Sequence, residues 1–237
     1  MLKALCALSL LLLLLPLVIL GVVLIWIETR DRCLFKQVRV GKNLRTFTIY
    51  KLKTMIDRKK TDQNDLFVDN EKYTTKSGRL LRMSKIDEIP QLWNIIKGDM
   101  DFVGPRPIRE PLHNFYMQNI PNFECRYQTL PGLTGISQII DPENTDRSLG
   151  LAFDCYYINN KSVKLDVQII VSTVIYLMYS LSREIYNWTI ARWLRRVNVD
   201  IPNIQADNLQ HDNTLEVLYK KSEEVKETAR GYGLQDQ

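Results

Sequence analysis

Residues 84–107, SKIDEIPQLWNIIKGDMDFVGPRP, carry the densest structural and chemical signals in the chain. The apolar pattern of 91–97, followed by Gly98, predicts a short helix that ends at the glycine. Residues 104–107, GPRP, predict a turn that holds Arg106 between two prolines. The stretch therefore predicts a helix and a rigid loop downstream of two adjacent acids.

Those acids are Asp87 and Glu88. Neighbouring side chains on a regular helix point about 100° apart, but Pro90 disfavours helical backbone at Ile89, so a break there would redirect the two carboxylates. Two close carboxylates need a shared proton or a cation between them, and in a phosphate-handling site that cation is usually Mg²⁺. Taken alone, an Asp-Glu pair is more often a solvated surface feature.

An apolar segment at the N-terminus decides the compartment. Residues 4–27 form a run of 24 residues without a charge. As a helix this run would be about 36 Å long, which is enough to cross a hydrocarbon core of about 30 Å. A secretory signal peptide is the alternative, but the run exceeds the usual apolar region and shows no small-residue cleavage pattern before Glu28. Residues 1–27 are therefore predicted to be a membrane anchor.

Pro16 lies in the middle of this anchor and predicts a kink. Two topologies follow: a kinked helix that spans the bilayer, or a re-entrant hairpin with both ends in the cytoplasm. Spanning helices tolerate proline, so the residues alone favour the spanning helix.

The charge pattern orients the rest of the chain. Residues 28–60 contain eleven Lys or Arg and three acids, a net of +8 in a chain whose total is +5. The positive-inside rule therefore predicts a domain that faces the cytoplasm. The four cysteines agree, because their spacing suggests neither a disulfide framework nor a CxxC metal site.

The remaining chain predicts an α+β fold, mainly helical, with a small sheet. Residues 28–201 have the size of one compact catalytic domain, with a strand at 47–50. Residues 167–182 are apolar but short for a span, and 183–196 form a pattern typical of an interfacial amphipathic helix, with packing on the domain's own core as the alternative. Residues 202–237 read as a polar tail with one helix.

Basic residues near the acid pair favour a phosphate-binding site over a pair of solvated surface acids. Arg82 precedes Asp87 by five residues, and Lys51 and Lys53 alternate along the predicted strand. Together with Arg106 they are candidates to neutralise a diphosphate.

Four motifs in sequence order carry a resemblance to a known family. They are IYKLKTM (49–55), GRLLRMSKIDEIPQLWNIIKGDMDFVGPRP (78–107), RYQTLPGLTGISQI (126–139) and FDCYYINNKSVKLDV (153–167). Over residues 35–198 the chain resembles the bacterial sugar transferases, the small monotopic phosphoglycosyl transferases.

The resemblance implies a two-step exchange. Asp87 would attack the β-phosphate of a UDP-sugar and release UMP, and a polyprenol phosphate, usually undecaprenyl phosphate, would then take the phosphosugar from Asp87. Glu88 would bind Mg²⁺, with Asp87 as a second candidate ligand. Arg82, Arg106 and Gln138 would contact substrate, as would Lys51 and Lys53 from the residue pattern.

The resemblance also implies a re-entrant anchor kinked at Pro16, on the cytoplasmic face of the bacterial inner membrane. Membrane lipid is then a partner in its own right. The chain departs from the family at Ile136-Ser137, where Trp-Ala is common, and this departure bears on nucleotide or sugar contacts.

Other functions have weaker support. A membrane-anchored scaffold or regulator of polysaccharide assembly is the alternative, but it would not need an acid pair among phosphate-directed bases. The basic excess lies beside the anchor, where lipid explains it, so no nucleic-acid partner is expected. His113 and His211 lack metal-ligand spacing. The glycan, the sugar and the oligomeric state stay open, with a homodimer through the helices after Val167 as one option.

Overall fold

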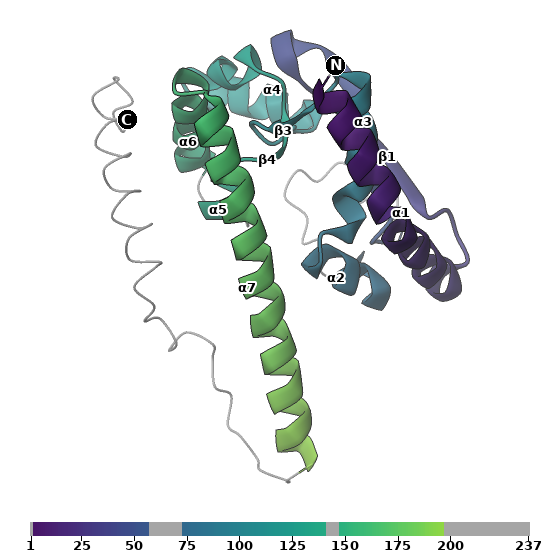
Figure 1. Cartoon of the computed structure of the whole chain (residues 1–237). Coiled ribbons are helices and arrows are strands. Elements are labelled where there is room, and N and C mark those ends of the chain that lie inside the picture. The colour runs from purple at the N-terminus through teal and green to yellow at the C-terminus, as the bar shows by residue number, and fades with distance from the viewer. Residues whose placement is uncertain (1, 57–72, 141–146, 197–237) are drawn as a thin grey trace. The chain divides into compact units, whose positions relative to one another are not determined.

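The computed structural model describes residues 2–56, 73–140 and 147–196, and within the last range it describes side chains for 149–183 (Figure 1). The chain divides into two compact units, residues 1–173 and 174–237. The first unit contains the acid pair and all four family motifs. The described part of the second unit is the continuation of one long helix.

The described part of the chain is mainly helical, as the sequence predicts, and has two small sheets where one was expected. In chain order the elements are α1 (Leu2–Thr29), β1 (Leu34–Val40), η1 (Lys42–Leu44), β2 (Thr46–Leu52), α2 (Lys76–Met83), η4 (Ile86–Gln91), α3 (Leu92–Lys97), β3 (Asp101–Val103), α4 (Glu110–Asn119), η5 (Phe123–Gln128), β4 (Gly132–Thr134), α5 (Ile136–Ile140), α6 (Arg147–Asn159) and α7 (Val163–Arg196).

Each sheet has two strands. β1 and β2 form an antiparallel hairpin in register from Leu34↔Leu52 to Val40↔Thr46, and β2 contains the predicted strand at 47–50. β3 and β4 are parallel. The predicted helix at 91–97 is confirmed as α3, which ends at Gly98 in the left-handed conformation.

α1 packs along one side of the first unit. Near its start, Ala7 is fully buried in a cluster with Ile49 of β2 and Leu92 of α3. Near its end, Ile25 is fully buried against Leu52 and Leu81. Figure 1 shows the α1 ribbon changing direction part-way along its length, and Pro16 inside the helix accounts for this bend.

Polar contacts fasten both ends of α1 to the same unit. At the start, Lys3 Nζ lies 2.5 Å from Asp101 Oδ2 on β3. At the end, the Glu28 carboxylate accepts hydrogen bonds from the backbone N–H groups of Lys76 and Ser77, each at 2.8 Å. Glu28 thereby caps the first turn of α2 with a negative charge, which the helix dipole favours.

The other side of α1 is apolar and exposed. Of the residues in α1, Ala7, Gly21 and Ile25 are buried, and the helix is long and apolar enough to cross a membrane. Residues Val163–Arg183 of α7 are also long and apolar enough to cross a membrane. These two helices indicate that the chain associates with a membrane.

The region after Val163 differs from the prediction of two segments. Residues 163–196 form a single helix, α7, with no break between 182 and 183. Val163, Val167 and Val171 near its start are exposed, whereas Ile169 is buried in a cluster with Val103 and Tyr157, so one face of this segment joins the core. The side chains of 184–196, which carry the predicted interfacial pattern, lie outside those described, as does the predicted tail 202–237.

The cysteine expectation is also corrected. Cys125 on η5 and Cys155 on α6 form a disulfide, with Cα atoms 6.1 Å apart. Thirty residues separate them in sequence, and such a contact leaves no local spacing pattern. Their neighbours, Arg126 and Asp154, are also paired and are described with the site.

Candidate active site

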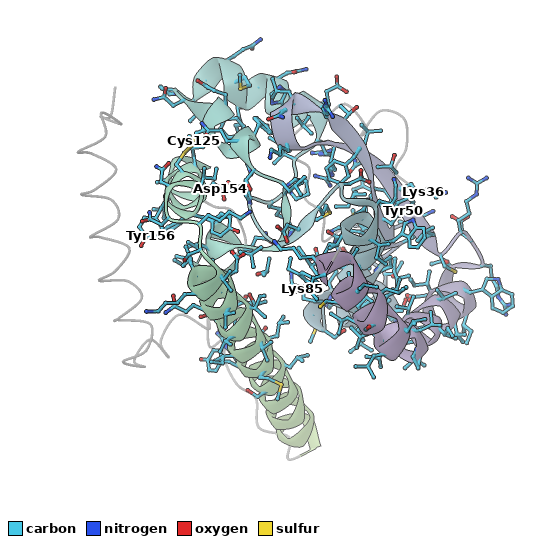
Figure 2. All side chains as sticks on the ribbon, turned by 45° about the horizontal axis from the view of Figure 1, so that its top comes forward. Lys36, Tyr50, Lys85, Cys125, Asp154 and Tyr156 are labelled. Carbon is cyan, nitrogen blue, oxygen red and sulfur yellow. A yellow bond between two sulfur atoms is a disulfide. The ribbon has the colours of Figure 1, made fainter. Side chains whose placement is uncertain are left out.

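The acid pair lies in η4, a 3₁₀ turn that begins after Lys85. Lys85 adopts the left-handed conformation (φ 55°, ψ 15°), and Figure 2 labels it. The predicted break at Ile89-Pro90 is wrong, because the 3₁₀ turn runs through Pro90 directly into α3. Chain redirection happens at Lys85, upstream of the acids, and both carboxylates are buried.

Glu88 is held by two cations. Its Oε1 lies 2.6 Å from Lys51 Nζ and 3.0 Å from Arg106 Nη2. Burial alone would raise the pKa of Glu88, but the charges of Lys51 and Arg106 outweigh burial and hold that pKa well below its ordinary value. Glu88 is therefore a fixed negative charge.

Asp87 has the opposite character. Burial, followed by the charge of Glu88, raises the pKa of Asp87 to about 6. Its Oδ1 is buried and has no hydrogen-bond partner within the described residues. Asp87 therefore has a carboxylate oxygen available for another atom, beside a carboxylate whose Oε1 is paired with two cations.

The loop that carries Arg106 is held by its carbonyl groups. Because Pro105 and Pro107 have no N–H, the loop offers few donors. Its four consecutive carbonyl oxygens, at residues 105–108, accept hydrogen bonds in order from the Gly132 N–H at 3.0 Å, Arg126 Nη2 at 2.8 Å, Arg39 Nη1 at 3.2 Å and the Val40 N–H at 3.0 Å. Two strands and two arginines thus position Arg106.

Gln138 joins the site through Arg106. Its Oε1 accepts from Arg106 Nη1 at 3.0 Å, while its buried Nε2 has no partner in the part of the chain described. The neighbouring Ser137 donates to Asp154 Oδ1 at 3.1 Å, and Asp154 Oδ2 lies 3.0 Å from Arg126 Nη2. Asp154 is labelled in Figure 2 on α6, close to Cys125.

Two candidate residues, Arg82 and Lys53, form their described hydrogen bonds and ion pairs with residues outside the acid pair. Arg82 donates to Thr54 and Thr74 and lines a cavity of about 180 Å³ with Thr74, Arg79 and Met83. Arg82 is near enough to Asp87 to lower its pKa. Lys53 lies past the end of β2, with Nζ 2.6 Å from Asp31. The structure therefore brings Lys51, Arg106 and Gln138 to the acid pair and takes Lys53 elsewhere.

A comparison with known families adds to this geometry. The family model described as bacterial sugar transferase matches residues 1–180. The chain belongs to the bacterial sugar transferase family. The match includes α1 together with every residue of the site described above.

Several curated relatives match this sugar transferase. A UDP-N-acetylgalactosamine-undecaprenyl-phosphate N-acetylgalactosaminephosphotransferase of Aeromonas hydrophila is 34% identical over 67% of the chain and 38% of the relative. A UDP-glucose:undecaprenyl-phosphate glucose-1-phosphate transferase of Caulobacter vibrioides is 36% identical over 67% of the chain and 61% of the relative. The exopolysaccharide production protein PSS of Rhizobium leguminosarum is 34% identical over 71% of the chain and 89% of the relative. The chain thus spans less than two thirds of the first two relatives.

The donor set of this sugar transferase fits a Mg²⁺ ion shared with substrate. No group of three or more His, Cys, Asp or Glu that could hold a metal occurs within the described ranges. Mg²⁺ commonly binds one or two carboxylates and completes its shell with water and phosphate oxygens. Asp87 Oδ1, which lacks a protein partner, and the adjacent Glu88 suit that mode of binding.

Sequence reasoning missed the residues that support the site. Arg39, Arg126 and Asp154 act through backbone carbonyls and through each other, so no spacing rule identifies them. Arg126 and Asp154 do lie within the family motifs at 126–139 and 153–167. Their position within these motifs is the sequence signal that points to a role for Arg126 and Asp154.

Proposed function

We propose that the chain is a membrane-bound phosphoglycosyl transferase that moves a sugar 1-phosphate from a UDP-sugar to undecaprenyl phosphate. The observation that carries this proposal is the contrast within the acid pair: Glu88 is neutralised by two cations, whereas Asp87 keeps a buried oxygen without a partner. The names of the relatives support the two substrates.

In the first step Asp87 acts as a nucleophile. A carboxylate oxygen attacks the β-phosphorus of the UDP-sugar, and the bond from that phosphorus to the bridging oxygen breaks. UMP leaves with the bridging oxygen, and the sugar 1-phosphate remains on Asp87 as an acyl phosphate. Glu88, held by Lys51 and Arg106, stays ionised throughout this step.

In the second step an oxygen of undecaprenyl phosphate attacks the same phosphorus. The bond between phosphorus and Asp87 breaks, which regenerates the carboxylate and yields an undecaprenyl diphosphate sugar. Bound Mg²⁺ would offset the charge of the diphosphate and of the leaving UMP. Glu88 and Asp87 are the residues that would hold it.

The substrates have distinct binding residues in this proposal. Arg82 and the cavity beside it would receive phosphate oxygens, since a guanidinium matches their geometry. The unpartnered Nε2 of Gln138 would donate to the nucleotide or sugar, on the far side of Arg106. Lys53, paired with Asp31, would contribute only to the general positive field.

The anchor matches this chemistry if it enters the membrane and returns. Lys3 and Glu28, at opposite ends of α1, both contact the catalytic unit, which a helix with one end across the bilayer would not allow. We therefore propose a re-entrant α1 in the inner membrane, with the catalytic unit at the cytoplasmic surface, where soluble UDP-sugar and the lipid phosphate meet.

Release of UMP tests the proposed function. Purified protein in detergent or nanodiscs is incubated with Mg²⁺, undecaprenyl phosphate and a panel of UDP-sugars. At least one UDP-sugar should give UMP, and chelation of Mg²⁺ should abolish the signal. Asp87→Asn should reduce release by at least about a thousandfold, the scale expected for loss of a catalytic nucleophile.

A scaffold or regulator would behave differently in the same assay. It would release no more UMP than Asp87→Asn with every sugar, and that result would overturn the transferase proposal. Lys53→Gln serves as a matched control, because it removes a basic residue whose described ion pair is with Asp31 and not with the acid pair. It should keep most of the wild-type rate.

A further inference from the structure

We propose that Asp154 and Arg126 are positioning residues that set the Arg106 side chain against Glu88, and so control the catalytic step from outside the site. This inference rests on the proposed function, which supplies the reaction that Arg106 serves. Neither residue touches Asp87 or Glu88 in any contact described above. Their effect passes through the backbone and the side chain of Arg106.

Arg126 fixes the backbone of Arg106. Its Nη2 donates to the Arg106 carbonyl at 2.8 Å and lies 3.0 Å from Asp154 Oδ2, so one nitrogen bridges the loop and α6. The guanidinium also lies over the Phe123 ring, 5.0 Å from its centre. Arg126 and Asp154 are both buried.

Asp154 fixes the side-chain partner of Arg106 as well. Its Oδ1 accepts from the Ser137 hydroxyl at 3.1 Å, at the start of α5. The next residue, Gln138, accepts from Arg106 Nη1 at 3.0 Å. A single carboxylate therefore anchors both routes to Arg106, one through Arg126 and one through α5.

The geometry of Arg106 matters because its two terminal nitrogens have different partners. Nη1 bonds Gln138 and Nη2 pairs with Glu88 at 3.0 Å, so a rotation or shift of the guanidinium breaks one contact or both. Loss of the Asp154 charge would leave a buried Arg126 cation near Arg106 without its counter-ion, and unpaired buried charges force local rearrangement. The Glu88 carboxylate would then lose one of its two holding cations.

A double-mutant cycle tests the proposal. Asp154→Asn should lower kcat for UMP release by at least about tenfold, because small displacements of catalytic groups are costly. In an Arg106→Gln background, the same substitution should change kcat by less than about twofold, because the group it positions is gone. Full additivity of the two effects would overturn the proposal.

Milder variants keep the test useful if Asp154→Asn folds poorly. Arg126→Met should lose activity as Asp154→Asn does, whereas Arg126→Lys, which keeps a cationic donor, should recover most of it. Ser137→Ala should produce a smaller loss that is also non-additive with Arg106→Gln. Equal loss in Arg126→Lys and Arg126→Met would contradict a role for the charged donor.

Tyr157→Phe is the matched structural control on α6. The Tyr157 hydroxyl is buried and bonds the Val103 carbonyl and Asp166, so its loss should lower thermal stability. It should leave kcat within about twofold and show no coupling to Arg106→Gln. If Tyr157→Phe lowers kcat as much as Asp154→Asn, the role of Asp154 is merely structural.

Amide hydrogen exchange provides a readout that needs no turnover. The N–H groups of Val40 and Gly132 donate to the Arg106 loop, so Asp154→Asn should speed their exchange, and Tyr157→Phe should not. Unchanged exchange overturns the positioning proposal even if the enzyme is active. If Asp154→Asn speeds exchange but the wild-type protein releases no UMP, the positioning role is supported and the proposed function is overturned.

Discussion

Asp87 and Glu88 are neighbours with opposite electrostatic surroundings. Lys51 and Arg106 both approach Glu88 Oε1, whereas Asp87 is buried without an equivalent ion pair among the described contacts. Burial, followed by the charge of Glu88, destabilises the charged form of Asp87 and raises its pKa to about 6, against the smaller opposing effects of nearby cations. The charged form of Asp87 therefore lowers the stability of the fold at neutral pH.

This reasoning predicts that Asp87→Asn stabilises the metal-free protein. Because the folded-state pKa is raised, the stability that Asp87 contributes is present below about pH 4 and lost as the pH rises through about 6. At pH 7.5 the variant should unfold with a free energy roughly 1 to 3 kcal/mol larger than wild type, and near pH 4 the difference should vanish. Thermal or denaturant unfolding in detergent, with chelator present, measures both values.

Asp31→Asn is the control for this prediction. Asp31 is exposed, and its hydrogen bond from Lys53 lowers its pKa, so this substitution should not stabilise the protein at pH 7.5. An Asp87→Asn variant that is no more stable than wild type at pH 7.5 would contradict the raised pKa.

The parallel strands β3 and β4 bring the Arg106 loop and the segment before Gln138 together. At this crossing a Cβ on Gly132 would collide with the backbone N and O of Gly104, and a Cβ on Gly104 would collide with the Leu130 carbonyl. Glycine at both positions allows the two backbones to approach. The loop carbonyl at Pro105 can then reach the Gly132 N–H.

Gly132→Ala should therefore destabilise the protein by about 2 kcal/mol or more, as expected for overpacking against rigid backbone. Gly150→Ala is the matched control, because a Cβ there meets nothing within 4 Å. In the α6 helix it should stabilise by roughly 0.5 to 1 kcal/mol. Chemical unfolding of the two variants checks the pair, and equal effects of the same sign would contradict the close approach.

The elements show what sequence could and could not predict. The α3 helix and its end at Gly98 follow from local rules, as do the strand at 47–50 and the N-terminal apolar helix. The proline rule predicts a redirection at Ile89-Pro90, whereas the structure has it at Lys85, because the proline rule is local and the left-handed conformation of Lys85 is a tertiary outcome. The Arg126–Asp154 pair joins η5 to α6, and only the fold reveals contacts of that kind.

At the scale of the whole molecule, the topology of α1 decides where the catalytic unit works. Its length suits a span, and the sequence rules alone favour that reading. Contacts of Lys3 with β3 and of Glu28 with α2 place both ends on the first unit. They favour the re-entrant arrangement, in which one side of α1 faces lipid.

Cysteine labelling in membrane vesicles tests this topology. In an otherwise cysteine-free chain, Leu2→Cys and Val163→Cys introduce thiols at two strongly exposed positions of the first unit. Both should react with a membrane-impermeant maleimide from the cytoplasmic side only. Reaction of Leu2→Cys only from the opposite side would establish a spanning α1.

The central claim is that Asp87 carries the phosphosugar between the two substrates. Protein incubated with Mg²⁺ and a UDP-sugar that supports UMP release, but without undecaprenyl phosphate, is digested with protease and analysed by mass spectrometry. The account predicts a sugar-phosphate adduct on the peptide that contains Asp87, lost when undecaprenyl phosphate is added and absent from Asp87→Asn. An adduct on another residue, or efficient transfer to lipid by Asp87→Asn, would contradict it.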